Sequence, residues 1–147
     1  MSRPDRARRW VALLLVIYVA LIALVGIIPR PIDQGITPWV RGMLATMQRG
    51  GLPSVIDYDV VEYGVHFALF VPLGILLTVT LGRKLVWLAL ILGGLAGVNA
   101  EVWTSRLAEE PLSQLDLFLN IAGVVVGVAV GWWALAPYSR AGRAPGR

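Results

Sequence analysis

The chain has 147 residues, of which 57% are hydrophobic, with a mean hydropathy of +0.72 and a formal net charge of +4. It contains no cysteine and one histidine, which excludes disulfides, cysteine nucleophiles, thiolate metal sites and multi-histidine metal centres. The positive charge lies in the tails and loops rather than on a folded basic face, so we expect no nucleic-acid partner. We also expect no metal and no cofactor.

Four apolar runs fill most of the sequence, and each reaches the ~20 residues that cross a ~30 Å hydrocarbon core. They cover about residues 10–28, 60–81, 85–103 and 115–136. The sequence therefore predicts an all-α, polytopic membrane bundle in which residues 10–136 form one domain with four transmembrane helices. The first run is longer than the apolar core of a signal peptide, so we expect it to be a retained helix.

A short amphipathic helix is predicted in the long segment between the first two runs. Thr37-Pro38 is typical of a helix start, with proline at the first helical position, and Gly50-Gly51 ends the pattern. Between these points apolar side chains recur at steps of three and four residues: Trp39, Val40, Met43, Leu44 and Met47. Such a helix either lies on the outer membrane surface or caps the bundle, and the sequence leaves both interpretations open.

The remaining runs contain signals for how the helices pack. Pro72 and Gly74 interrupt the second run near its middle, where we expect a kink or local unwinding. Only residues 82–84 separate the second run from the third, so these two form a tight antiparallel hairpin. Small residues four apart allow helix backbones to approach closely in lipid. This spacing occurs in the third and fourth runs at Gly93, Gly97, Gly123, Gly127 and Gly131.

Lys and Arg residues near the ends of the runs predict the orientation, because cytoplasmic flanks carry more of them. One set of flanks comprises residues 1–9, the turn at 83–84 and the tail at 137–147, and it holds nine; the other set holds four. Both termini are therefore predicted to be cytoplasmic. Residues 1–9 form a basic N-terminal segment, and residues 137–147 form an Arg/Gly/Pro-rich tail that we expect to be disordered.

With this orientation, polar residues from three runs fall at one depth near the outer surface. They are Glu62 and His66 in the second run, Asn99 and Glu101 in the third with Arg106 just beyond it, and Asp116 and Asn120 in the fourth. Polar and ionisable residues within a membrane are costly, so their arrival at one level needs an explanation. We interpret them as the lining of an outward-facing polar cavity that binds a ligand.

Several of these residues also have a structural interpretation. Asp59 and Glu62 have the spacing of a helix-capping box, as do Ser113 and Asp116, and such acids would simply start their helices. The asparagines would form hydrogen bonds between helices, and the histidine would fill a packing position.

Glu101 is harder to explain in structural terms. It lies in the last turn of the predicted third helix, where the helix dipole disfavours an anion, and its neighbours are apolar. We therefore expect its carboxyl group to be either paired or protonated, and the two candidate partners are Arg106 and His66.

The same residues carry a family resemblance, over about residues 57–131. The second run reads Glu62-x-x-x-His66-x-x-x-Phe70-x-Pro72-x-Gly74, and a later block reads Glu101, Thr104, Arg106 and Asp116-x-x-x-Asn120-x-x-Gly123. In this order the motifs resemble those of the VanZ-like membrane proteins, although Thr104 replaces a common glutamine and the link at 107–112 is longer than usual. The resemblance implies a bacterial plasma-membrane protein with a role in teicoplanin resistance or envelope physiology, and it supplies no catalytic residues.

Three functions remain open at this point. The favoured one is a non-enzymatic envelope protein that binds membrane lipid, a lipoglycopeptide or a lipid-linked cell-wall precursor through its headgroup in the outer cavity. The second is a membrane-embedded enzyme that modifies such a precursor, with Glu101 and Asp116 as acid and base, although no known nucleophile motif is present. The third is a small transporter, but the inner halves of the runs contain almost no polar residues. The sequence does not determine the oligomeric state.

Overall fold

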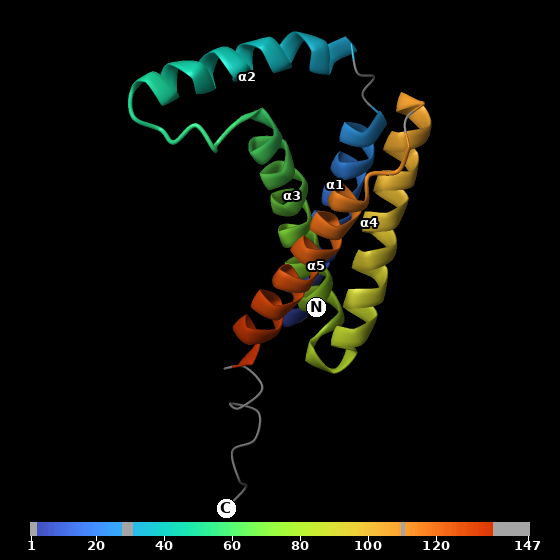
Figure 1. Cartoon of the computed structure of the whole chain (residues 1–147). Coiled ribbons are helices and arrows are strands. Elements are labelled where there is room, and N and C mark those ends of the chain that lie inside the picture. Colours follow the sequence, from blue (N-terminus) through green and yellow to red (C-terminus); the bar gives the residue numbers. More distant parts are fainter. Residues whose placement is uncertain (1–2, 28–30, 110, 137–147) are drawn as a thin grey trace, which may run out of the picture.

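The computed structural model describes residues 3–27, 31–109 and 111–136, and every regular element in these ranges is helical (Figure 1). In chain order they are α1 (Arg3–Ile27), α2 (Pro31–Arg49), α3 (Tyr58–Leu81), a short 3₁₀ turn η1 (Arg83–Leu85), α4 (Val86–Ala108) and α5 (Gln114–Ala134). The prediction of a disordered tail at 137–147 lies outside the described residues.

Three of these helical segments are long and apolar enough to cross a membrane, namely Tyr58–Leu81, Arg83–Leu107 and Gln114–Ala134. A shorter apolar stretch, Arg9–Leu24, lies within α1. Many large apolar side chains on these helices point outward and are exposed, as expected for a bundle surrounded by lipid. The predicted all-α membrane fold is therefore confirmed for three spans by length and composition.

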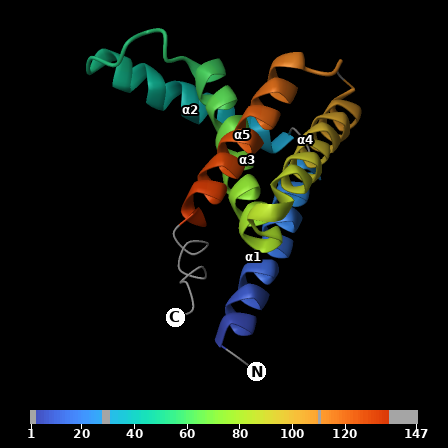
Figure 2. The same cartoon turned by 90° about the horizontal axis from the view of Figure 1, so that it is seen from below.

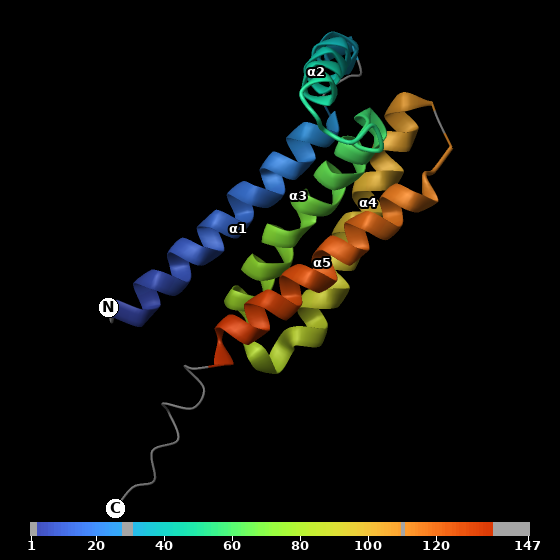
Figure 3. The same ribbon diagram turned by 60° about the vertical axis from the view of Figure 1, so that its left-hand side comes forward.

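In the bundle, α3 lies between α1 and α5 (Figure 3). α1 packs against α3 and α4, and α5 packs against the same two helices. The start of α3, the end of α4 and the start of α5 lie at the same end of the bundle as α2, which we call the α2 end (Figures 1 and 3). The polar residues predicted to share one depth therefore do come from helix segments at one end.

α3 and α5 cross in direct backbone contact, because both helices have glycine at the crossing. A Cβ atom added to Gly127 would collide with the carbonyl oxygen of Val71, and one added to Gly74 would lie 2.5 Å from the carbonyl oxygen of Val124. A Cβ atom added to Gly123 would lie equally close to the backbone of α3. The close packing predicted from the glycine spacing is therefore confirmed.

The apolar core surrounds this crossing. Its buried side chains are Phe70, Leu73 and Leu77 of α3, Ala89 of α4, and Val124 and Val128 of α5. Gly93 of α4 belongs to the same contact, since a Cβ there would lie 2.5 Å from a methyl carbon of Val124. α1 is tied to the outside of this core by the Tyr18 hydroxyl, which donates to the carbonyl oxygen of Leu69 at 2.7 Å.

The hairpin between the second and third apolar runs forms as predicted. α3 ends at Gly82, whose positive φ of 82° lets the chain turn directly into η1 and α4. The Arg83 guanidinium lies 4.0 Å from the ring centroid of Trp132, which ties this turn to the last part of α5. The local unwinding predicted at Pro72 is wrong, because α3 is one continuous helix across that residue.

α2 begins earlier than predicted. It starts at Pro31 rather than at Thr37-Pro38, because Pro31 meets the same preference for proline at the first helical position, and Pro38 lies inside the helix. α2 crosses the α2 end of the bundle and projects beyond it (Figures 1 and 2). It ends where the Gly50 N–H donates to the last carbonyls of the helix and Gly51 adopts a φ of 109°.

The apolar residues of α2 lie on two sides of the helix. Trp39, Met43 and Met47 follow one another at four-residue steps on one side and are exposed. Leu44 lies on the other side and is buried, as expected of a helix that caps the bundle. The exposed stripe matches a helix that lies on a membrane surface.

The glycine contact leads to a first prediction. Gly127→Ala should lower the free energy of unfolding by about 1–3 kcal/mol, because the new methyl group meets the α3 backbone, which cannot rotate away. Gly94→Ala is the matched control, since nothing lies within 4 Å of a Cβ at that position. Thermal unfolding in detergent micelles, followed by circular dichroism, measures both variants. Equal melting temperatures would contradict the role of the contact.

Candidate functional site

The site begins with the N-terminal cap of α5. Ser113 is the cap residue, and its Oγ accepts a hydrogen bond from the Asp116 N–H at 3.2 Å. In a complete capping box the Asp116 carboxylate would in turn accept the Ser113 N–H. The Ser113 N–H instead donates to Oε1 of Glu101 on α4, at 2.9 Å. The predicted pair thus forms only one of its two bonds, and a carboxylate from another helix makes the second.

This bond accounts for the position of Glu101, whose side chain is only 5% exposed. α4 continues to Ala108, so Glu101 lies about two turns before the end of α4 and not in its last turn as predicted. Its carboxylate faces the first turn of α5, where the helix dipole favours an anion. Within the described ranges it forms no ion pair with Arg106, which is exposed, or with His66.

Asp116 is left without a partner by the same arrangement. Its Oδ1 atom is buried and accepts no hydrogen bond. Burying a carboxylate oxygen without a donor is unfavourable, and the first turn of α5 shows no compensating contact for this atom. The side chain therefore has an unfilled hydrogen-bonding capacity inside the α2 end of the bundle.

Two further predicted residues lie next to Asp116. Asn120 follows one turn later on the same face of α5 and is 1% exposed. Its Oδ1 lies 3.4 Å from Nδ1 of His66 on α3, and the histidine tautomer determines whether this nitrogen donates. Glu101, Ser113, Asp116, Asn120 and His66 thus bring α3, α4 and α5 together, and we call these five residues the polar cluster.

The other predicted site residues lie around or away from this cluster. Glu62 is exposed on α3, one turn before His66, and Arg106 is exposed near the end of α4. Asn99 is exposed as well, and its Nδ2 donates to the Leu95 carbonyl oxygen of its own helix at 2.8 Å. Asn99 lines a separate apolar groove of about 290 Å³ between α1 and α4, so the structure does not bring it to the polar cluster.

The start of α3 differs from its predicted cap. Asp57 is the cap residue, with its Oδ1 accepting from the Val60 N–H at 3.1 Å. Asp59 and Glu62, which were predicted to form the capping box, lie inside the helix. The helix begins two residues before the apolar run does, because Asp57 offers the same capping chemistry two residues before Asp59.

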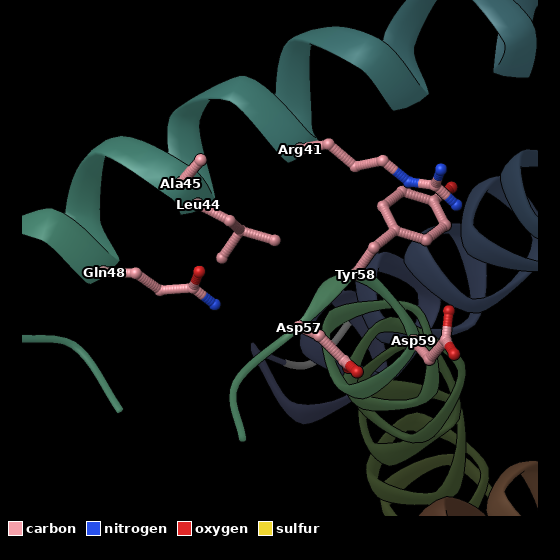
Figure 4. A pocket seen from close by; sticks show the side chains of 7 residues that line it. All are labelled: Arg41, Leu44, Ala45, Gln48, Asp57, Tyr58 and Asp59. Atoms are coloured by element: carbon pink, nitrogen blue, oxygen red, sulfur yellow. The ribbon is translucent and has the colours of Figure 1, made fainter. Parts of the chain in front are cut away.

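A polar pocket between α2 and the start of α3 was not predicted (Figure 4). It has a volume of about 340 Å³ and is lined by Arg41, Leu44, Ala45, Gln48, Asp57, Tyr58 and Asp59. Gln48 helps to hold the two elements together, because its Nε2 donates to the carbonyl oxygen of Ile56 at 3.0 Å. The acidic pair and the basic helix were visible in the sequence, but only the loop between them brings the two sides together.

No group of three or more His, Asp or Glu side chains in the described part of the chain is placed to hold a metal ion. The polar cluster supplies hydrogen-bond acceptors and one imidazole. Its chemistry suits recognition of a ligand that carries N–H or O–H donors.

Comparison with known proteins gave no match: no protein-family model, no curated protein and no solved structure matches the chain. The resemblance to VanZ-like proteins, drawn from the motifs, therefore stays a prediction.

The cap arrangement predicts opposite effects for its two acids. Glu101→Ala should destabilise the protein by about 1–3 kcal/mol, because it leaves the Ser113 N–H without its acceptor. Asp116→Asn should stabilise it by about 1 kcal/mol, because a neutral amide is less costly to bury than an unpartnered carboxylate. Thermal unfolding in detergent measures both, with the exposed Glu109→Ala as control. A destabilised Asp116→Asn protein would show that the carboxylate has a structural partner.

Proposed function

We propose that the chain is a VanZ-like, multi-pass protein of the bacterial plasma membrane that binds the headgroup of a lipid or amphiphile at the α2 end of its bundle. Binding lowers the access of lipid-bearing glycopeptides such as teicoplanin to their membrane-bound target. The observation that carries this proposal is the buried carboxylate oxygen of Asp116, which has no hydrogen-bond partner.

The reason lies in how α5 is capped. A helix that needed Asp116 only to start would let it close its own capping box, but Glu101 makes that bond instead. Asp116 is therefore retained at a cost to stability, as is common for residues that bind a ligand. Headgroups, sugars and peptide amides all carry the N–H or O–H donors that such an oxygen accepts.

The proposal favours binding over catalysis for a structural reason. The enzyme hypothesis needs Glu101 and Asp116 to act as an acid and base pair. Glu101 already accepts the N–H that begins α5, so protonating that carboxylate would weaken the hydrogen bond that starts the helix. Binding by Asp116, Asn120 and His66 requires no such change.

The proposed topology has four spans with both termini in the cytoplasm. Two observations support α1 as the fourth span: its apolar stretch Arg9–Leu24, and its packing along α3 and α4 through Tyr18. The nine Lys and Arg residues of one set of flanks, against four in the other, support a cytoplasmic α3–α4 turn and an outer α2 end.

Single-cysteine labelling tests this topology directly, because the chain has no native cysteine. Thr46→Cys and Glu109→Cys lie at the α2 end and should react with a membrane-impermeant maleimide in intact cells. Lys84→Cys lies in the opposite turn and should react only after the cells are permeabilised. Labelling of Lys84→Cys alone in intact cells would invert the proposed orientation.

Drug susceptibility tests the binding role. In a teicoplanin-sensitive host that expresses the protein, Asp116→Asn should reduce the inhibitory concentration to that of cells without the protein, because the negative charge and one of the two acceptor oxygens are lost. Glu109→Gln, an exposed acid outside the polar cluster, should leave protection intact. Immunoblotting of membranes checks that protein levels are equal.

Two outcomes count against the proposal. Full protection by Asp116→Asn at equal expression removes Asp116 from the binding site. A changed profile of lipid-linked precursors in cells that express the wild type would indicate an enzyme instead.

A further inference from the structure

The pocket between α2 and α3 gathers charges of both signs that do not neutralise one another (Figure 4). The Arg41 guanidinium stacks over the ring of Tyr58, 5.2 Å from its centroid. Asp57 uses Oδ1 to cap α3, which leaves its second oxygen available, and Asp59 is exposed. Among the described residues, neither carboxylate forms an ion pair with Arg41. The pocket therefore has a cationic side on α2 and an anionic side at the start of α3.

A pocket with this charge distribution suits a zwitterion. The planar fork of Arg41 matches a phosphate group, to which guanidinium groups bind with two parallel hydrogen bonds. The carboxylates of Asp57 and Asp59 match an ammonium group on the other side. The two carboxylates would repel a purely anionic ligand, and Arg41 would repel a purely cationic one.

The ammonium group must carry N–H donors. Quaternary ammonium groups are recognised mainly by open aromatic faces. A face of Tyr58 is already covered by Arg41, and the remaining lining contains no other aromatic ring. Carboxylate oxygens instead favour a primary ammonium, to which they form charge-assisted hydrogen bonds.

The surroundings of the pocket suit a lipid rather than a free zwitterion. Val60, Gly64 and Ala68 follow Asp57 along one face of α3, at helical spacing, and all three are exposed. Nothing lies within 4 Å of a Cβ at Gly64, so this face has open space directly along the helix. An acyl chain that descends from the pocket would lie on this apolar strip.

We propose that this pocket binds a zwitterionic phospholipid with a primary ammonium group, of the phosphatidylethanolamine class. Its phosphate lies at Arg41, its ammonium lies between Asp57 and Asp59, and a chain lies along Val60, Gly64 and Ala68. This inference rests on the proposed function in one respect, which is that the α2 end lies at a membrane surface. It adds a second site, separate from the polar cluster, and names its lipid class.

Native mass spectrometry of the purified full-length protein tests the lipid class. The protein is loaded from an equimolar mixture of phosphatidylethanolamine, phosphatidylglycerol and phosphatidylcholine. We expect phosphatidylethanolamine to be retained roughly tenfold over either competitor, the size expected for one charge-assisted hydrogen-bonding group. Equal retention of all three lipids, or preference for phosphatidylglycerol, would overturn the inference.

Three charge variants locate the site. Arg41→Gln should weaken retention of every phospholipid roughly tenfold, because the phosphate partner is lost. Asp59→Asn should remove the preference for phosphatidylethanolamine over phosphatidylcholine. Asp57→Asn should do the same while keeping α3 capped, since asparagine is an equally good cap residue. Unchanged retention in Arg41→Gln, together with unchanged lipid preference in both aspartate variants, would place the lipid elsewhere.

Two controls separate this inference from the proposed function. Arg49→Gln removes a charge from the same helix outside the pocket and should retain lipid as the wild type does. Asp116→Asn should lose protection against teicoplanin yet keep the lipid preference. Loss of lipid retention with full drug protection in Arg41→Gln would confirm that the two sites are independent. Unchanged lipid retention in Arg41→Gln, together with loss of the lipid preference in Asp116→Asn, would move the lipid to the polar cluster and overturn the inference.

Discussion

The direct contact of α3 with α5 determines where every other functional group lies. Gly74 and Gly127 let the two backbones touch, and no side chain in the crossing can act as a spacer. The contact continues toward the α2 end, where a Cβ at Gly97 of α4 would lie 3.3 Å from the Cβ of Asn120. Because the three helices are this close, Asn120 reaches His66, and Ser113 reaches Glu101. A wider crossing would separate the members of the polar cluster and admit lipid between them.

At the cap of α5, one acid forms the hydrogen bond that starts the helix and the other does not. Glu101 crosses from α4 and accepts the N–H that begins α5, so its charge is stabilised by a helix other than its own. In a capping box the side chain at the position of Asp116 accepts this N–H, but here the Asp116 side chain does not. The stability of the helix start then no longer depends on Asp116, and that side chain is available for recognition.

Features that depend on a single helix or on its ends were predicted from the sequence. Most features that depend on the loops were not. The runs, the short turn at Gly82, the glycine spacing and the common level of the polar residues are properties of individual segments, and all of these appear in the structure. The partner of Glu101 was not predicted, because it depends on the end of α4, where Glu109 adopts the left-handed region, and on the position of Ser113 at the start of α5. The pocket at Arg41 was missed because the path of the loop after α2 brings its two sides together. Asn99 was assigned to the site only because it lies at the same depth as the other polar residues. Depth does not specify which face of α4 a residue occupies.

The helices in closest contact are not neighbours in the chain. All of α4 separates Gly74 from Gly127, so during synthesis α3 enters the membrane before its main packing partner exists. The α3–α4 hairpin is complete before α5 is translated, and the arrival of α5 closes the contact at Gly74. The same step creates the polar cluster, because three of its five members belong to α5 or its cap. A nascent chain halted after α4 would hold a correctly turned hairpin but no polar cluster.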